Sequence, residues 1–341
     1  MVSLQNSPWR ITFDTNPDDC NLHCIMCEGF SKYSSQNHSH PRRMDVQIIE
    51  KVIEEMAPLG LTEIIPSTMG EPLLYDHFDE IIALCRKFGL KLNVTTNGTW
   101  PKRGPQGWAE KICPVTSDIK ISWNSADKKT QEEIMPISLY EKRSSDLKLF
   151  VKTRDKIAER GNYCRITLQA TFMELNLQGL PELIKLAADI GADRVKGHHL
   201  WVNFPELKGQ NLRRNDDSIA RWNATVKLCE KMDEHTSLNG KHMFLENFTA
   251  ISKDYVTGVC PFLGKEAWIS ADGTFNPCCA PDEERKSLGY FGNVKDTGLK
   301  ALWASEEYRK LVNKPFANKI CQKCNMRKAL KFAAHPDKPK L

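Results

Sequence analysis

Three cysteines lie within eight residues of one another in the segment DDCNLHCIMCEG, at Cys20, Cys24 and Cys27. Thiolates spaced so closely are metal ligands, and two kinds of centre compete for them. A structural zinc site takes four ligands in a tetrahedron, and His38 or His40 could complete it, although such sites usually use two separated ligand pairs. A cubane iron–sulfur cluster held by three thiolates instead leaves one iron open to an exogenous ligand, as a catalyst requires. The spacing favours the cluster.

A second set of cysteines lies near the end of the sequence. Four thiolates are enough to saturate one 4Fe–4S cluster or one zinc ion. The sequence holds twelve cysteines and shows no export signal, so we expect metal ligands and free thiols rather than disulfides. The second set comprises Cys260, Cys278, Cys321 and Cys324, and Cys279 directly follows one of its members.

Composition narrows the class of protein. With 341 residues, 40% of them hydrophobic, the chain can form a core of ordinary size. The net charge is only +5, and the Lys and Arg residues are dispersed among 43 acidic residues. This distribution argues against nucleic-acid binding. No apolar run approaches the roughly 18 residues of a membrane span, and the first residues lack the apolar stretch of a signal peptide. We therefore expect a cytoplasmic protein that does not bind a membrane.

Segments typical of strands alternate with amphipathic segments typical of helices from residue 10 to about residue 235. Six β–α units in series predict a parallel sheet covered by helices, either open and doubly wound or curled into a barrel. Parallel barrels carry their active sites on loops that follow the strands, and the three close cysteines directly follow the first strand. The expected strands are 10–15, 61–67, 90–96, 117–123, 163–172 and 192–201, and the expected helices are 44–60, 76–89, 139–160 and 180–191.

The pattern changes beyond about residue 240. Residues 260–279 predict a β-hairpin that turns at Asp272 and Gly273, and one helix follows within residues 292–314. We expect a large domain at 1–239, a smaller domain at 240–325 and a disordered tail at 326–341.

The motif Cys-x3-Cys-x-x-Cys after the first strand of a six-unit β/α chain resembles the radical S-adenosylmethionine (SAM) superfamily. The resemblance implies a partial (β/α)6 barrel of the TIM type and a 4Fe–4S cluster held by Cys20, Cys24 and Cys27, with SAM on its open iron. In that superfamily an electron splits SAM into methionine and a 5′-deoxyadenosyl radical, which abstracts a hydrogen atom from the substrate. A flavodoxin- or ferredoxin-type reductant is implied as a partner.

Residues that follow successive strands match the SAM contacts of this superfamily. Gly70 and Glu71 in STMGEP resemble its glycine–glutamate motif, with Met69 in place of a common first glycine. A carboxylate at that position would pair with the ammonium group of SAM. The other residues that the resemblance implies as SAM contacts are Met26, Asn97, Ser122, Asn124 and Gln169.

The second cysteine set resembles the SPASM/Twitch extension of the same superfamily. Full SPASM domains continue with further cysteines, whereas none follows Cys324. The resemblance therefore implies the reduced, Twitch-type form, in which Cys260, Cys278, Cys321 and Cys324 hold one auxiliary 4Fe–4S cluster. A zinc ribbon is the alternative, and the amino-terminal triad favours iron–sulfur. A fully ligated cluster implies electron transfer rather than substrate binding.

Twitch-type relatives include dehydrogenases of aminocyclitols, so the leading expectation is an oxidoreductase acting on a secondary alcohol of a sugar or aminocyclitol-like small molecule. A base must accept the hydroxyl proton. His198 and His199 at the end of the sixth strand are candidates because histidine titrates near neutrality, and alternation sends them to opposite faces. Arg165 and Glu174 are further candidates.

Three alternatives stay open. A radical epimerase of a carbohydrate or peptide needs a thiol as hydrogen donor, and Cys279 is a better candidate than Cys164. Maturation of a ribosomal peptide is the second, although a first strand near residue 10 leaves no room for the leader-binding segment that such enzymes often carry. The third is a non-catalytic zinc-binding scaffold.

Overall fold

The computed structural model describes residues 4–67, 69–233, 243–253, 258–324 and 326–327. The chain forms two compact units, and β3 (Lys91–Thr96) passes from the first to the second. The expected α/β fold, a partial barrel of the TIM type with a small C-terminal domain, is confirmed. The first unit comprises Met1–Asp19, Ser39–Asn93 and Asp254–Leu341, and the second comprises Cys20–His38 and Val94–Lys253.

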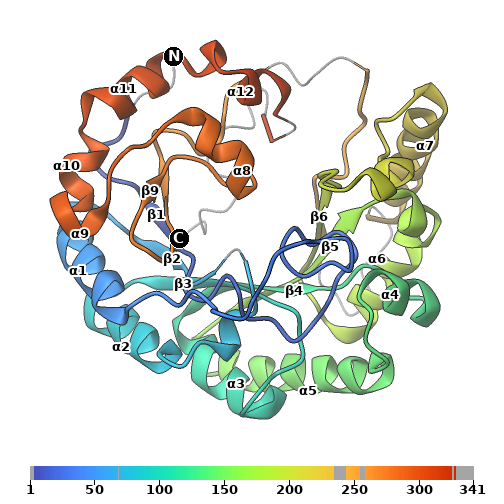
Figure 1. Cartoon of the computed structure of the whole chain (residues 1–341). Coiled ribbons are helices and arrows are strands. Elements are labelled where there is room, and N and C mark those ends of the chain that lie inside the picture. The colour runs from blue at the N-terminus through green and yellow to red at the C-terminus, as the bar shows by residue number, and fades with distance from the viewer. Residues whose placement is uncertain (1–3, 68, 234–242, 254–257, 325, 328–341) are drawn as a thin grey trace. The chain divides into compact units, whose positions relative to one another are not determined.

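Strand β1 is central in the first unit. It pairs in parallel with β2 on one side and with β8 on the other, so Arg10 lies opposite both Glu63 and Glu266. The predicted hairpin is present, because β9 pairs antiparallel with β8 (Figure 1). The pairing of β8 with β1 was not predicted, and it makes the C-terminal hairpin part of the same sheet. The bounds are β1 (Arg10–Phe13), β2 (Glu63–Ile65), β8 (Glu266–Ile269) and β9 (Phe275–Asn276).

Amphipathic helices cover this part of the sheet. Helix α1 buries Ile49, Ile53 and Met56, and its N-cap residue Asp45 accepts a hydrogen bond from the Gln47 N–H. Helix α1 packs against α2, and the C-terminal helices α9 and α10 also contact it. The helices are α1 (Val46–Met56), α2 (Phe78–Phe88), α8 (Asp282–Arg285), α9 (Val294–Thr297), α10 (Leu299–Trp303), α11 (Glu306–Asn313) and α12 (Lys319–Lys323), with short 3-10 helices η1 (Ala57–Leu59), η2 (Pro72–Leu74), η7 (Lys286–Leu288) and η8 (Pro315–Ala317).

The second unit holds parallel strands in the order β4-β5-β6-β7. The sequence predicted the first three of them but not β7. Helices α3 and α5 pack against each other, below β4 in the view of Figure 1. The strands are β4 (Thr116–Ser122), β5 (Arg165–Phe172), β6 (Arg194–His199) and β7 (Phe244–Glu246), and the helices are α3 (Gly104–Ile112), α4 (Lys128–Ile134), α5 (Tyr140–Ala158), α6 (Leu180–Ile190) and α7 (Asp216–Asp233), with 3-10 helices η3 (Cys113–Val115), η4 (Glu174–Gly179) and η5 (Pro205–Gln210).

Alternation along these strands separates an apolar face from a polar one. Ile119, Ile166 and Leu168 on the apolar face are fully buried. Gly197 belongs to the same face, where an added Cβ would lie 2.0 Å from the Phe172 ring, so only glycine lets Phe172 pack there. The polar face carries Asp118, Lys120, Ser122, Arg165, Thr167, Gln169, Thr171, Arg194, Lys196 and His198.

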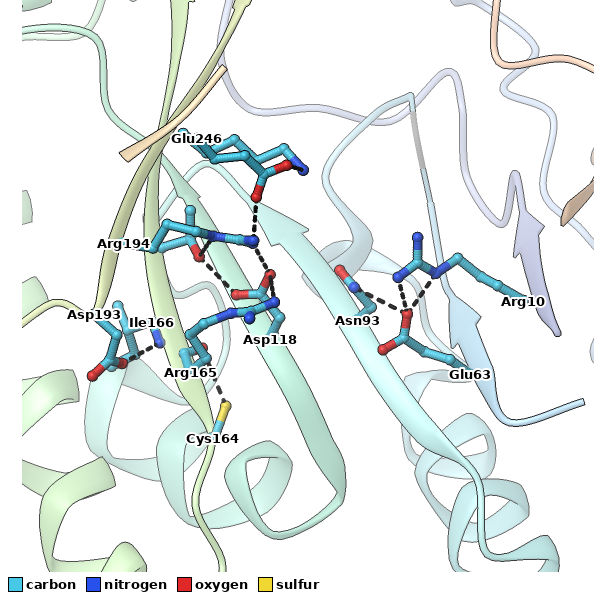
Figure 2. Close-up of polar contacts among 12 residues, drawn as sticks. Arg10, Glu63, Asn93, Asp118, Cys164, Arg165, Ile166, Asp193, Arg194 and Glu246 are labelled. Carbon is cyan, nitrogen blue, oxygen red and sulfur yellow. Dashed lines mark hydrogen bonds and ion pairs between the residues drawn. The ribbon is translucent and has the colours of Figure 1, made fainter. Parts of the chain in front are cut away.

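Each unit buries charged groups where its strands begin (Figure 2). In the first unit, Arg10 donates to Glu63 (Nε to Oε1, 2.5 Å) and lies 3.3 Å from Glu266 (Nη1 to Oε1). Asn93 donates to the same Glu63 oxygen at 3.1 Å. All of these side chains are buried, so their mutual hydrogen bonds replace those lost to water.

In the second unit, the fully buried Asp118 accepts from Thr167 at 2.8 Å and forms ion pairs with Arg165 and Arg194. Arg194 also pairs with Glu246 of β7, as does Lys196 (Nζ to Oε1, 2.8 Å). Burial alone would raise the pKa of Asp118. The charges of Lys120, Arg194 and Arg165 outweigh burial and hold that pKa below its ordinary value. The network thus connects β4, β5, β6 and β7.

The predicted domain boundary between residues 239 and 240 and most of the predicted tail lie outside the described residues. Among the residues that are described, no helix has the length and apolar character needed to cross a membrane.

Replacing Asp118 by Asn should destabilise the fold by ~3–5 kcal/mol, because it leaves buried guanidinium groups without their counter-charge. Asp216→Asn is the matched control, since Asp216 pairs with Lys253 at the surface and should contribute at most ~1 kcal/mol. Urea unfolding of the two variants and the wild type, followed by circular dichroism, measures both effects. Equal midpoints for D118N and D216N would contradict this assignment.

Candidate active site

Cys20, Cys24 and Cys27 lie on a loop of the second unit that a small apolar cluster holds in place. The Cys27 N–H donates to the Cys24 carbonyl at 3.0 Å, which forms a turn. The Ile25 N–H donates to the Ile134 carbonyl at 3.0 Å. Cys20 and Cys24 pack against the buried side chains of this cluster, as does the predicted SAM contact Met26. The cluster consists of Leu22, Ile25, Ile134, Met135, Met173, Leu200 and Leu207.

The three thiols are close enough to affect one another electrostatically. Burial is the main cause that raises the pKa of Cys24, and the neighbouring Cys27 and Cys20 raise it further. Burial also raises the pKa of Cys27. Thiolates at such positions need a positive counter-charge, which a bound metal centre supplies as the thiols lose their protons. The donor set therefore fits a cationic cluster.

Asn97 lies beside the triad rather than apart from it. Its Nδ2 donates to the Asn21 Oδ1 at 2.8 Å and lies 3.8 Å from the Cys20 sulfur, within hydrogen-bond range for sulfur. Its Oδ1 accepts from the Thr99 N–H at 3.0 Å, which fixes the orientation of the amide. The sequence identified Asn97 as a SAM contact, and the structure adds a hydrogen bond to a proposed cluster ligand.

Arg143 lies near the triad, although the sequence did not point to it. Its guanidinium donates to the Asn97 carbonyl at 2.5 Å and to the Ser122 carbonyl at 3.0 Å, so it connects the ends of β3 and β4. Its charge also opposes the rise in the pKa of Cys24. The signal was available, because Arg143 precedes Leu147, Phe150 and Arg154 at helical spacing on the buried side of α5.

Two of the predicted SAM contacts lie side by side on the polar face. Register pairs Ser122 with Gln169, and Gln169 in turn with Lys196. Asn124, directly beyond β4, uses its Oδ1 to accept from the Thr171 N–H at 2.8 Å. Its Nδ2 is buried and has no hydrogen-bond partner among the described residues. A buried amide N–H that lacks a partner is suited to donate to an acceptor group on a bound ligand.

Gly70 and Glu71 lie in the first unit and contact Asn16 and Asp19, in the segment that precedes Cys20. Gly70 has φ of 72°, and an added Cβ would lie 2.1 Å from the Asn16 carbonyl oxygen, so the close approach requires glycine. The Glu71 N–H donates to the Asp19 carbonyl at 2.8 Å. The buried Glu71 carboxylate accepts from the Leu73 N–H at 3.2 Å and caps η2. These contacts fix the backbone conformation of Gly70 and Glu71. Their role in binding SAM stays a prediction.

The two histidines face opposite sides of β6, as alternation predicted. His198 lies on the polar face opposite Thr171. His199 lies on the apolar face, with its ring centroid 4.6 Å from that of Trp222 and 5.7 Å from that of Phe172. Burial and the charge of Arg213 lower the pKa of His199 from 6.5 to about 3, so this imidazole is neutral at physiological pH.

The other candidates for proton or hydrogen transfer have structural partners. Arg165 pairs with Asp118, and Glu174 forms surface ion pairs with Arg214 and Arg221. Cys164 is fully buried. Their proposed roles stay predictions that nothing in this arrangement favours.

The second cysteine set comes together in the first unit. Burial, followed by the charges of Cys278 and Cys324, raises the pKa of Cys260 to about 12 and that of Cys321 to about 11. A hydrogen bond from the Cys279 thiol lowers the pKa of Cys278 to about 7. The structure thus brings the four predicted auxiliary ligands together, with Cys279 beside them.

Zinc and iron–sulfur centres differ in the distance at which they hold their thiolates. Over the described part of the chain, no group of three or more His, Cys, Asp or Glu side chains could hold one metal ion. Tetrahedral zinc needs its thiolates about 3.8 Å apart, whereas a cubane spaces them more widely because each binds a different iron. His38 is also engaged elsewhere, with Nε2 2.9 Å from the Gly29 carbonyl and its ring stacked on Phe30.

Comparisons with known proteins agree with this arrangement. The model of the radical SAM superfamily matches residues 17–153, and that of the SPASM iron–sulfur cluster-binding domain matches residues 260–325. The tungsten-containing aldehyde ferredoxin oxidoreductase cofactor-modifying protein of Pyrococcus furiosus is 22% identical over 336 residues, or 93% of this chain and 88% of the relative. PqqA peptide cyclase of Methylobacterium nodulans is 22% identical over 312 residues, or 90% and 76%.

Solved structures share the fold. SuiB of Streptococcus suis bound to SAM has a TM-score of 0.65 at 16% identity, covering 94% of this chain and 72% of its own. The protein anSMEcpe with bound SAM has a TM-score of 0.65 at 14% identity, covering 93% and 84%.

Fold and cysteine sets together define an iron–sulfur protein of the partial-barrel class. The chain is a radical SAM protein with a C-terminal SPASM domain. Its cofactors are SAM and 4Fe–4S clusters, one of them auxiliary, as the resemblance implied.

Asn97→Ala should lower the midpoint potential of the SAM-binding cluster, because an N–H donor near a ligating sulfur stabilises the more negative, reduced state. Asn162→Ala, at an exposed turn, is the matched control. Redox titration monitored by electron paramagnetic resonance measures both, and the auxiliary signal should not shift. An unchanged potential in N97A would contradict a hydrogen bond from Asn97 to the Cys20 sulfur.

His199 predicts a specific pH dependence of stability. Its folded-state pKa of about 3 lies below the ordinary 6.5, so the unfolded chain takes up the proton first as the pH falls. Stability is therefore lost progressively below about pH 6.5, by up to ~1.4 kcal/mol per pH unit through this group. His199→Phe should remove this contribution, whereas His40→Phe, at an exposed position, should not. Urea unfolding at pH 7.5 and 5.5 tests this, and an identical pH dependence in wild type and H199F would refute it.

Proposed function

We propose that this radical SAM enzyme acts on a peptide and abstracts a hydrogen atom from one of its residues. The observation that carries this proposal is a strip of half-buried apolar side chains. They pack against the cluster of buried apolar residues that holds the cysteine loop. The rings of Tyr33 and Phe204 contact each other in it, tilted by 48° and with centroids 5.9 Å apart. This apolar strip consists of Met26, Tyr33, Ile137, Leu175, Val202 and Phe204.

The chemistry of the apolar strip distinguishes amino-acid side chains from sugars. Apolar surface placed against the strip gains free energy in proportion to the area removed from water, about 25 cal/mol per Å². A sugar or aminocyclitol would bury hydroxyl groups there without hydrogen-bond partners, which is unfavourable. The apolar strip therefore favours a peptide over the secondary alcohol that the sequence suggested.

The names of three relatives support a peptide as well, whereas the Pyrococcus furiosus relative is named for modifying a cofactor. PqqA peptide cyclase is named for a peptide, SuiB has been seen with its precursor peptide SuiA, and anSMEcpe with the peptide Cp18Cys. None of the relatives described above supports an aminocyclitol alcohol as substrate.

Within this proposal, Cys20, Cys24 and Cys27 hold the SAM-binding cluster, and Cys260, Cys278, Cys321 and Cys324 hold the auxiliary cluster. Bound together, SAM and the first cluster supply a 5′-deoxyadenosyl radical once a flavodoxin- or ferredoxin-type protein provides an electron. The remaining assignments are Gly70, Glu71, Met26, Asn97, Ser122, Asn124 and Gln169 as SAM contacts.

The chain's own groups then position the reaction. Asn124 offers its buried Nδ2 to an acceptor on SAM, and Ser122 and Gln169 offer neighbouring polar groups on the same face. His198 is the group on this face suited to accept a proton from an oxidised substrate, because histidine titrates near neutrality. His199 cannot take that role from the apolar face. Cys279 is assigned as hydrogen donor only if the reaction proves to be an epimerisation.

Transfer of deuterium identifies the substrate class. The reconstituted, reduced enzyme is supplied with SAM and either a fully deuterated peptide digest or a fully deuterated carbohydrate mixture, and 5′-deoxyadenosine is analysed by mass spectrometry. We expect deuterium in 5′-deoxyadenosine from the peptides, and none when Cys20, Cys24 and Cys27 are all replaced by Ala. A Cys85→Ala variant is the matched control and should remain active, because Cys85 belongs to neither set.

Label that comes from the carbohydrates alone would overturn the peptide assignment. Label that persists in the triple variant would overturn the assignment of the triad. With the peptide identified, a product lighter by two hydrogens indicates dehydrogenation, and solvent deuterium in a product of unchanged composition indicates epimerisation.

A further inference from the structure

The C-terminal part of the first unit contains a groove of about 720 Å³ that no role described so far uses. It lies between the segment around Tyr290 and helix α11, with η8 at one end. We call it the α11 groove. Its size is in the range of sites that bury a small ligand or a few residues of a peptide.

The floor of the α11 groove is apolar and firmly packed. Phe291 and Leu311 are both buried, and the Phe291 ring packs edge-on against Phe275 and Tyr308, at centroid distances of 6.3 and 6.2 Å. Ser305 caps α11 by accepting from the Tyr308 N–H at 3.3 Å. The floor is therefore formed before any ligand arrives, which reduces the entropy lost on binding.

The rim of the α11 groove has the composition of a binding surface. The side chain of Tyr290 is 70% exposed at the groove edge, although it is large and aromatic. Exposed aromatic rings beside a groove are enriched at interfaces, since they offer a rigid apolar face and a polar tip. Lys310 and Lys314 line the same groove together with one acidic residue, Glu307.

The segment that forms the α11 groove carries more basic than acidic residues, which favours a negatively charged occupant. Between residues 286 and 323 the chain carries eight Lys and Arg residues against three Asp and Glu residues. All eight basic side chains are exposed. One of them, Lys310, pairs with Glu306 within α11. An anionic ligand is therefore attracted to this surface, and a cationic one is repelled.

The chain's own C-terminal segment does not suit this surface. Residues 328–341, KALKFAAHPDKPKL, contain four lysines and one aspartate, so their charge has the same sign as that of the α11 groove. The occupant should instead carry large apolar side chains, which would pack on the floor of the α11 groove, and acidic groups, which would pair with its lysines.

We propose that the α11 groove binds a segment of the peptide substrate in which large apolar residues are flanked by acidic ones. This inference rests on the proposed function, because it assumes a peptide substrate. The groove would then be a recognition site on the SPASM domain, in addition to the contacts made at the reacting residue.

Binding of short labelled peptides to the full-length protein tests the proposal without SAM or reductant. The probe is fluorescein-EDLFDE, and the controls are EDSSDE, which lacks the apolar pair, and KKLFKK, which reverses the charge. We expect EDLFDE to bind at least about tenfold more tightly than either control, judged by fluorescence anisotropy. Raising the salt concentration should weaken binding.

Variants locate the site. Tyr290→Ala and Lys314→Glu should each weaken binding of EDLFDE by about fivefold or more. Their matched controls are Leu228→Ala and Lys152→Glu, exposed residues of α7 and α5 in the second unit, and these should leave binding unchanged. Iron content and the circular dichroism spectrum should be the same in all four variants, because Tyr290 and Lys314 are exposed.

Each other outcome overturns the proposal. Equal binding of the three peptides would show that the groove does not select this chemistry. Preference for KKLFKK would indicate a basic occupant. Unchanged binding in both Y290A and K314E would place the peptide elsewhere, and binding of an acidic electron carrier but not of EDLFDE would make the surface a redox-partner site. Since this assay involves no radical chemistry, its failure is distinguishable from failure of the deuterium-transfer experiment.

Discussion

Both units depend on ion pairs between buried carboxylate and guanidinium groups. Glu63 lies between Arg10 and Asn93, and Asp118 lies between Arg165 and Arg194, in each case where parallel strands begin (Figure 2). Burying such charges costs several kcal/mol unless every partner is present in its place. Slipping one strand by a single residue would turn a charged side chain toward the helices. The ionic networks therefore favour one register, and that register determines which side chains meet at the other end of the strands.

Local patterns in the sequence were sufficient to predict most of the strands and their faces. In β5, alternation along RITLQATF puts Gln169 on the polar face and Leu168 on the apolar face. The same rule separated His198 from His199. The cysteine triad was visible because its members are close in sequence, so no tertiary information was needed to group them.

Features that depend on distant pairing could not be predicted. β7 is only three residues long, so its sequence gives no local signal. β8 was predicted as part of a hairpin, but its pairing with β1 spans more than 250 residues of chain and has no local signal either. The helical spacing of Arg143 with Leu147 and Phe150 indicates that it lies on the buried side of α5, but its contacts with the ends of β3 and β4 are visible only in the structure. The proposed substrate class also rests on tertiary structure, because the apolar strip gathers side chains that are distant in sequence.

The pairing of β8 with β1 has a consequence for any attempt to dissect this protein. The two strands share a four-residue parallel register from Arg10 and Glu266 to Phe13 and Ile269. A shortened chain that lacked the SPASM domain would expose the backbone N–H and C=O groups of β1 as an open sheet edge, which promotes aggregation. It would also leave the guanidinium of Arg10 with one carboxylate fewer. The barrel and the SPASM domain therefore cannot be exchanged independently between relatives. Such an exchange would have to preserve the pairing of β8 with β1 as well as the cysteines.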